Sequence, residues 1–209
     1  MVNIHINRFN LYFILQGEQK MSYAERLYKA ITLNVEFYES VEADKSLTRQ
    51  AMMTVALVSV VQGLVVAGIA APIALAQGVL GSIIRWFIWA FFIAFVGTRI
   101  LPEPETESDT GELLRTLGFA YAPGLLIVFQ FIPIIGNFID PLVVILQLAA
   151  MTVAVRQALD FTSTVRAVGV CIVAFVVMLI ALSLFILFTS FFVGVAESAI
   201  APTAPLMGV

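Results

Sequence analysis

The sequence predicts an all-α, polytopic integral membrane protein with five transmembrane helices and N-terminal cytosolic interfacial helices. Hydrophobic residues make up 61% of the 209 residues and charged residues only 12%, so the chain has more apolar surface than a soluble core of this length buries. The mean hydropathy is +1.01. The apolar residues form long runs, and several reach the roughly 20 residues that cross a hydrocarbon layer.

The composition also disfavours several functions. The net charge is −3 and the eleven Lys and Arg residues are dispersed, so no basic face for nucleic acid is expected. The single cysteine, Cys171, lies in an apolar run and allows neither an intrachain disulfide nor a multi-cysteine metal site. The single histidine, His5, provides no zinc-binding pair and no base for a hydrolytic triad. We expect a protein that is not an enzyme, with no catalytic, cofactor-binding or metal-binding residues.

Residues 1–50 are expected to form an N-terminal cytosolic segment at the membrane interface. Met21 opens a more regular pattern, which suggests the hypothesis that residues 1–20 are an extension from an upstream start codon. Residues 22–43 place apolar side chains on one helical stripe, and their aromatic residues suit the headgroup region. One or two interfacial helices would have this pattern, and so would a small soluble helix.

The transmembrane domain is expected to comprise residues 51–196. Gly63, Ala67 and Ala71 recur at four-residue intervals before Pro72 and form a ridge of small residues that lets another helix approach closely. The second apolar run contains Arg85 beside two tryptophans, which are typical of a membrane interface. The five spans are expected at about residues 51–71, 80–101, 119–135, 137–155 and 167–195.

Residues 102–118 are expected to form an acidic cytosolic linker that ends in a short helix. Asp109 and Glu112 have the spacing of a capping box at the start of that helix. The third span then contains Pro123 and Pro133, so it is expected to be short and kinked, with its freed carbonyls satisfied by neighbouring helices.

The fourth span is expected to begin with Asp140 as N-cap and a first-turn proline after it. Ala150, Ala154 and Ala158 give this span a second ridge of small residues. The last uncharged run, residues 167–196, is about ten residues longer than a span requires, so it must tilt or project beyond the bilayer. Residues 197–209 are expected to form an extracytoplasmic tail.

The basic residues predict the orientation of the spans. If the N-terminus is cytoplasmic, ten of the eleven Lys and Arg residues lie on the cytoplasmic side: six in residues 1–50, followed by Arg99, Arg115, Arg156 and Arg166. Because Lys and Arg in short loops determine orientation, we expect a cytoplasmic N-terminus and an extracytoplasmic C-terminus.

Arg85 is the exception to this distribution. It is expected about six residues inside the outer end of the second span, where its guanidinium could snorkel to the interface. Alternatively it could pair between helices with Asp140, which the predicted topology places at the same level. Such a pair would fix the order of the helices more than it would add stability.

A family resemblance rests on five segments between residues 22 and 195: AERLYKAITLNVEFYESVEAD, RQA, GELLRTLGFAYAPGLL, FIPIIG and AVRQALDFTSTVRAV. Through them the chain resembles bacterial members of the Yip family of Ypt/Rab-interacting, five-span membrane proteins. The resemblance implies five spans, a cytosolic N-terminus and the bacterial cytoplasmic membrane. Eukaryotic relatives are linked to Rab-type GTPases, but the bacterial branch lacks that machinery, so no Rab-type partner is expected.

The leading functional hypothesis is a non-enzymatic scaffold or accessory subunit of a hetero-oligomeric membrane complex, such as a respiratory or photosynthetic complex. It would act through its small-residue ridges and interfacial segment. A channel or small-solute permease is the alternative, although the central thirds of the spans offer little more polar than Gln62, Gln130 and Gln147. An intramembrane enzyme is least favoured. The candidate structural and interaction residues are Arg85, Asp140, Pro123, Pro133, Gly63, Ala67, Ala150 and Ala154.

Overall fold

A computed structural model describes residues 21–67, 72–104, 106 and 109–200. These residues form helices and no strand, which confirms the all-α prediction. The elements are α2 (Tyr23–Ile31), α3 (Val35–Ala43), the 3-10 turn η1 (Lys45–Leu47), α4 (Thr48–Ala67), α5 (Pro72–Phe95), the π-helical turn η2 (Val96–Ile100), α6 (Thr110–Phe119), the 3-10 helix η3 (Ala122–Phe131), α7 (Gly136–Ala158) and α8 (Thr164–Ile200).

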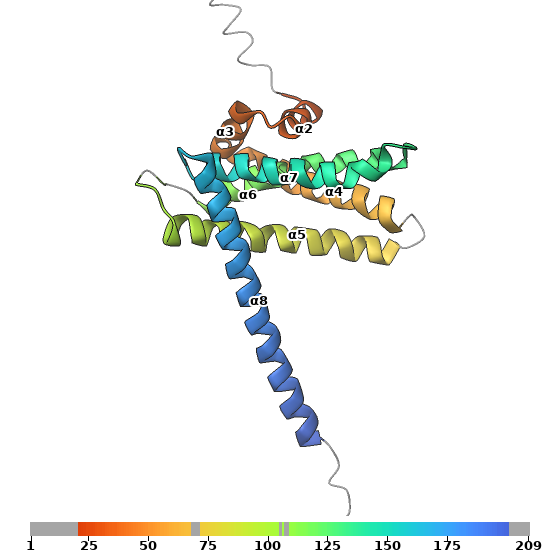
Figure 1. Ribbon diagram of the computed structural model, residues 1–209, viewed down its shortest axis with the longest axis vertical. Helices are drawn as coiled ribbons and strands as arrows, with labels where there is room; N and C mark the ends of the chain where they lie inside the picture. Colours follow the sequence, from red (N-terminus) through yellow and green to blue (C-terminus); the bar gives the residue numbers. More distant parts are fainter. Residues whose placement is uncertain (1–20, 68–71, 105, 107–108, 201–209) are drawn as a thin grey trace, which may run out of the picture.

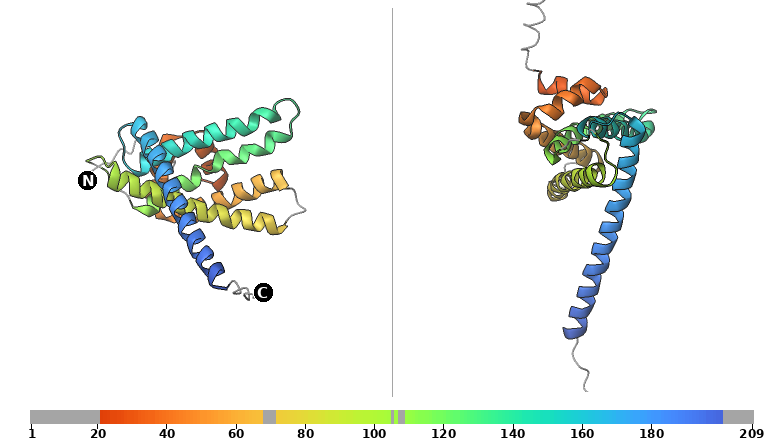
Figure 2. Two further views of the ribbon diagram at one scale, coloured as in Figure 1. Left: turned by 60° about the horizontal axis from the view of Figure 1, so that its bottom comes forward. Right: turned by 90° about the vertical axis from the view of Figure 1, so that its left-hand side faces the viewer.

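Five helical segments of the described chain are long and apolar enough to cross a membrane. They are Lys45–Val65, Pro72–Ile100, Thr110–Phe131, Gly136–Ala158 and Thr164–Val193. Figure 1 shows the first four side by side as a bundle, with α2 and α3 lying on one face of it. The fifth, α8, is steeply inclined to the bundle and extends well beyond it, as both views in Figure 2 show. The last run therefore projects beyond the other helices, while its tilt or projection relative to a bilayer stays a prediction.

Two helical segments extend beyond the expected spans because the helices continue through polar residues. The second segment begins at Pro72 instead of residue 80, since proline is favoured in the first helical turn and Gln77 and Gly78 continue the helix while exposed. The short helix expected in the acidic linker is α6, which forms the first half of the third segment. Its predicted capping box, Asp109 with Glu112, is present.

The fourth segment begins within one residue of the expected residue 137, but its predicted N-cap is wrong. Helix α7 begins at Gly136, so Asp140 is not its N-cap and Pro141 lies inside the helix. A Cβ atom at position 136 would lie only 2.1 Å from the carbonyl oxygen of Gln130. The close approach that glycine permits lets the chain reverse tightly after η3, and this starts the helix earlier than the Asp-Pro pair indicated.

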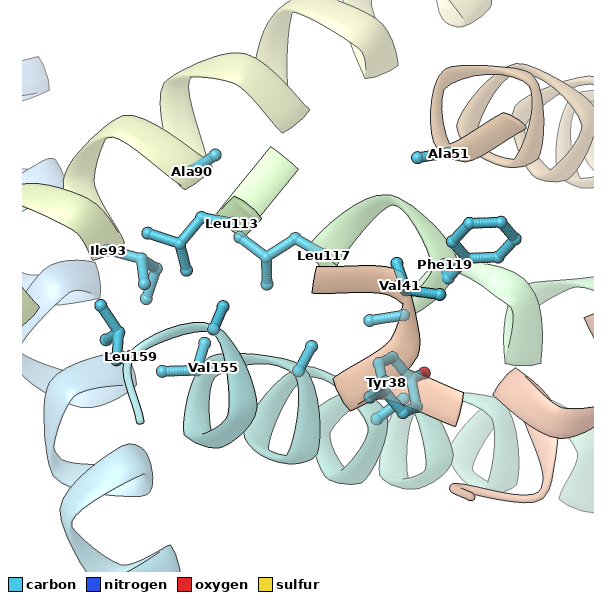
Figure 3. Packing of buried hydrophobic residues seen from close by; sticks show 14 of the residues in the cluster. Tyr38, Val41, Ala51, Ala90, Ile93, Leu113, Leu117, Phe119, Val155 and Leu159 are labelled. Atoms are coloured by element: carbon cyan, nitrogen blue, oxygen red, sulfur yellow. The ribbon is translucent and has the colours of Figure 1, made fainter. Parts of the chain in front are cut away.

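Helix α3 packs on the bundle through aromatic side chains. Phe37 and Tyr38 are buried, and the ring of Phe37 meets Phe119 edge to face with centroids 5.3 Å apart. Figure 3 shows Tyr38 and Val41 of α3 in the same apolar cluster as Leu117 of α6 and residues of α7. The N-terminal helices of the described chain are therefore docked on the bundle.

Arg115 attaches α6 to the end of α3. Only 3% of this arginine is exposed. Its Nε donates to the carbonyl oxygen of Val41 at 3.2 Å, and its Nη2 donates to the carbonyl oxygen of Glu42. These carbonyls belong to the last turn of α3, which has no partners for them within its own helix. The cation therefore caps a helix C-terminus, where its charge also complements the helix dipole.

The loops at one end of the bundle contact each other. The Glu103 carboxylate accepts hydrogen bonds from the backbone N–H and the hydroxyl of Thr162, both at 3.2 Å. Arg166 Nε lies 3.5 Å from the same carboxylate. The loop after η2 and the loop between α7 and α8 therefore lie together, and they bring several of the basic residues used in the orientation argument to one end.

Glu42 is expected to make stability depend on pH. Burial raises its pKa from 4.5 to about 7, and Asp160, Glu112 and Glu39 add to this while Arg115 opposes it. Because the folded protein holds this proton more tightly than the unfolded chain, stability from this group is full below about pH 4.5 and is lost as the pH rises through 7. We expect the melting temperature in detergent to fall over this interval, and Glu42→Gln to reduce the fall.

The matched control is Glu36→Gln, because Glu36 is exposed in the first turn of the same helix. It should leave the pH profile of the melting temperature unchanged. Equal profiles for the wild type and Glu42→Gln would contradict the assignment of this dependence to Glu42.

The contact between α4 and α6 is expected to be too close to accommodate one added methyl group. A Cβ atom at Gly118 would lie 2.7 Å from the Cβ of Ala51 and 3.0 Å from its backbone carbonyl, whereas one at Gly78 of α5 would meet nothing within 4 Å. Gly118→Ala should destabilise the protein by about 1–3 kcal/mol through overpacking. Gly78→Ala should be neutral or stabilise it by about 0.5–1 kcal/mol. Melting temperatures of the two variants test this, and equal values would be inconsistent with the close approach.

Candidate functional site

Arg85 lies near the middle of the second apolar segment. Thirteen residues separate it from Pro72, which corresponds to about 20 Å along the helix. The arginine is exposed, and its Nη2 donates to Ser82 Oγ at 2.8 Å, one turn toward the start of α5. It is therefore much farther from the end of its helix than the sequence indicated.

The predicted pairing of Arg85 with Asp140 is not formed. Among the described residues, the ion pair within 4.0 Å joins Arg166 to Glu103. Asp140 is exposed near the start of α7, at the end of the bundle where α5 also begins. Because α5 starts eight residues earlier than expected, Arg85 lies too far along its helix to reach that level.

The two tryptophans, which were expected to mark a membrane interface, pack inside the protein. Trp86 is 1% exposed and belongs to the core. Trp89 is partly buried, and its Nε1 lies 3.1 Å from Met151 Sδ of α7. Both follow Arg85 on α5, where the helix faces its neighbours in the bundle.

A cavity of about 520 Å³ lies beside Arg85. Its walls come from α5, α7, the first half of α8 and the turn between α6 and η3. Volumes of this size are typical of sites for small organic molecules. Apart from the arginine and one tyrosine its lining is mainly apolar. The lining residues include Arg85, Trp89, Tyr121, Met151, Phe175 and Met178.

The predicted ridges of small residues are used within the chain. A Cβ atom at Gly63 would lie 2.5 Å from Leu75 of α5, so this glycine lets α4 and α5 approach each other. Ala150 and Ala154 of α7 are fully buried in the core. Ala67 ends α4, and Ala71 lies outside the described residues. Close packing was a correct expectation, but at Gly63, Ala150 and Ala154 the neighbour belongs to the same chain.

The third segment is broken at the first of its two prolines. Helix α6 ends before Pro123, which lies at the start of η3. The carbonyl oxygen of Tyr121 accepts hydrogen bonds from the backbone N–H of Gly124 at 2.8 Å and from Gln147 Nε2 of α7 at 3.4 Å, so a neighbouring helix adds a hydrogen bond at the break. A Cβ atom at Gly124 would lie within 3.0 Å of the amides of both Gln147 and Gln62. Two predicted polar residues thus meet at the break.

Pro133, the second proline, has a different role. It is exposed in the turn between η3 and α7, where its carbonyl oxygen accepts from the backbone N–H of Ile135 at 3.0 Å. The proline therefore helps end the third segment and does not kink it.

Helix α8 contains the least buried of the five apolar segments of the described chain. Ala167, Val170 and Ala174 are buried against the bundle. In contrast, only 11% of the most apolar stretch of this helix is buried, compared with 61% in the third segment. The large apolar residues exposed beyond the bundle include Leu182, Leu184, Phe185, Ile186, Leu187, Phe188, Phe191, Phe192 and Val193.

Comparison with known proteins identified no relative. No family model matches the chain, and neither a curated protein nor a solved structure matches it. The resemblance to the Yip family therefore remains a prediction from the sequence.

Proposed function

We propose that this protein is a non-enzymatic scaffold or accessory subunit that contacts other membrane proteins through α8. The observation that carries the proposal is the apolar surface of α8 from Leu179 to Val193, where the large apolar side chains are exposed on all sides of the helix. A helix that is apolar all round requires lipid or another membrane helix around it. The bundle provides a fixed base, and α8 provides the surface that reaches a partner.

The small-residue ridges do not support this proposal in the way the sequence indicated. Gly63, Ala150 and Ala154 already pack against elements of the same chain, so they are not available to a partner. The contact surface is therefore assigned to α8 alone, in a hetero-oligomeric complex such as a respiratory or photosynthetic one.

The proposed location is the bacterial cytoplasmic membrane, with the N-terminus in the cytoplasm and the C-terminus outside. The loops that contact each other through Glu103, Thr162 and Arg166 support it. They bring basic residues from separate parts of the chain to one end, as positive loops on one side of a membrane would require.

Photo-cross-linking in native membranes tests the role of α8. A photoreactive amino acid is placed at Phe185, Phe188 or Phe192, which are all exposed on α8. Control positions are Ile73 of α5 and Phe138 of α7, which are equally apolar and exposed on the bundle. We expect one discrete protein adduct from the α8 positions, identified by mass spectrometry, and mainly lipid adducts from the controls.

Two results would contradict the proposal. One is the formation of lipid adducts alone at the α8 positions, since α8 would then face only the bilayer. The other is an adduct consisting solely of a second copy of this chain, because that would indicate a homo-oligomer instead of an accessory subunit.

A channel or permease is the second candidate, and the polar groups at the break of the third segment favour it. Gln62 and Gln147 converge on Gly124 between α4, η3 and α7, which is where a path through the bundle would need polar groups. The cavity at Arg85 lies elsewhere, against α8. Solute flux in liposomes that is lost in Gln147→Leu would establish this function in place of the scaffold.

A further inference from the structure

The cavity beside Arg85 combines one cation with apolar walls. The backbone of Arg85 lies about 20 Å along α5 from its start, and the guanidinium donates to Ser82 Oγ one turn nearer to that start. No carboxylate oxygen of the described chain lies within 4.0 Å of the guanidinium nitrogens. A cation at such a depth in a membrane is costly unless an anion or water accompanies it. An anionic group supplied by a ligand would provide the missing partner.

The walls of the cavity suit a flexible hydrocarbon chain. Trp89 and Phe175 contribute aromatic rings, and Met151 and Met178 contribute unbranched side chains that adapt to irregular shapes. Tyr121 adds a hydroxyl-bearing ring from the turn between α6 and η3. The site therefore offers one charged group and a long apolar surface, which is the complement of an amphiphile with a single anionic head.

We propose that this cavity binds a long-chain carboxylic acid, with the carboxylate on Arg85 and the chain between α5, α7 and α8. A guanidinium holds a carboxylate through two parallel hydrogen bonds. The depth of the site favours a carboxylate over a phosphodiester head. A carboxylic acid can enter an apolar region as the neutral form, because desolvation raises its pKa, and can then ionise beside the arginine. A phosphodiester remains charged and would have to be desolvated on the way.

The two tryptophans of the chain provide the probe. Trp89 lines the cavity and Trp86 is buried without lining it. The full-length protein in phosphatidylcholine nanodiscs is titrated, at mildly alkaline pH, with a stearate that carries bromine in the middle of its chain. Bromine quenches tryptophan fluorescence on contact. We expect saturable quenching that persists in Trp86→Phe and disappears in Trp89→Phe.

Two comparisons test the charge. The methyl ester of the same brominated acid and the Arg85→Gln variant each remove one partner of the ion pair. Each should weaken binding by about tenfold to a hundredfold, as expected for a charged hydrogen bond. Arg99→Gln is the matched control, since Arg99 is an exposed arginine at the far end of the same segment and should leave binding unchanged.

Several results would overturn the assignment. They are the absence of saturable quenching in the wild type, equal binding of the acid and its ester, unchanged binding in Arg85→Gln, and quenching that survives in Trp89→Phe. A brominated phosphatidylglycerol that competes with the acid and depends on Arg85 would assign the site to a phospholipid head instead.

Discussion

The close approach of α6 to α4 is the contact on which the rest of the bundle depends. Gly118 lies against Ala51 with no room for a side chain. Lipid offers membrane helices no hydrophobic reason to associate, so packing between small residues and a few polar contacts must hold them together. Ala150 and Ala154 of α7 are buried in the same apolar cluster as Ala51. The third segment consequently becomes the centre of the fold, and its burial of 61% is the highest of the five.

The position of the third segment explains both ends of the chain. Its first helix carries Arg115, which satisfies the last carbonyls of α3 and so fixes the N-terminal helices on the bundle. Because α3, α4, α5 and α7 already surround it, little of the core remains for α8. That helix packs through Ala167, Val170 and Ala174 and then leaves the bundle. The docked N-terminal helices and the exposed apolar part of α8 are thus consequences of the same packing arrangement.

The sequence was sufficient for features that depend on local chemistry. The capping box at Asp109, the break at Pro123 and the excess length of the last run all follow from neighbouring residues. It was insufficient where a contact distant in the chain decides the outcome. Arg115 was counted only among the basic residues of the cytoplasmic side, because no residue near it in the sequence indicates that it reaches the carbonyls of α3. The start of α7 depends in the same way on the approach of Gly136 to the chain before it.

The candidate residues show the same division. Small residues at four-residue intervals indicated close packing, yet spacing alone does not distinguish a neighbour in the same chain from one in another protein. The position of Arg85 along its helix depended on where α5 begins. The polar residues after Pro72 gave no reason to predict that α5 begins there. The cavity could not be predicted at all, since its walls come from elements far apart in the sequence.

The cavity and the exposed part of α8 are physically connected. Phe175 and Met178 line the cavity immediately after Ala174, the last residue of α8 buried against the bundle. A molecule in the cavity therefore touches α8 where the helix leaves its support. Such a ligand can favour one inclination of α8 only to the extent that it binds that arrangement more tightly than others. If the proposed acid contacts both Arg85 and the two α8 side chains, its affinity depends on the distance between α5 and α8, so occupancy would stabilise the position from which α8 meets a partner.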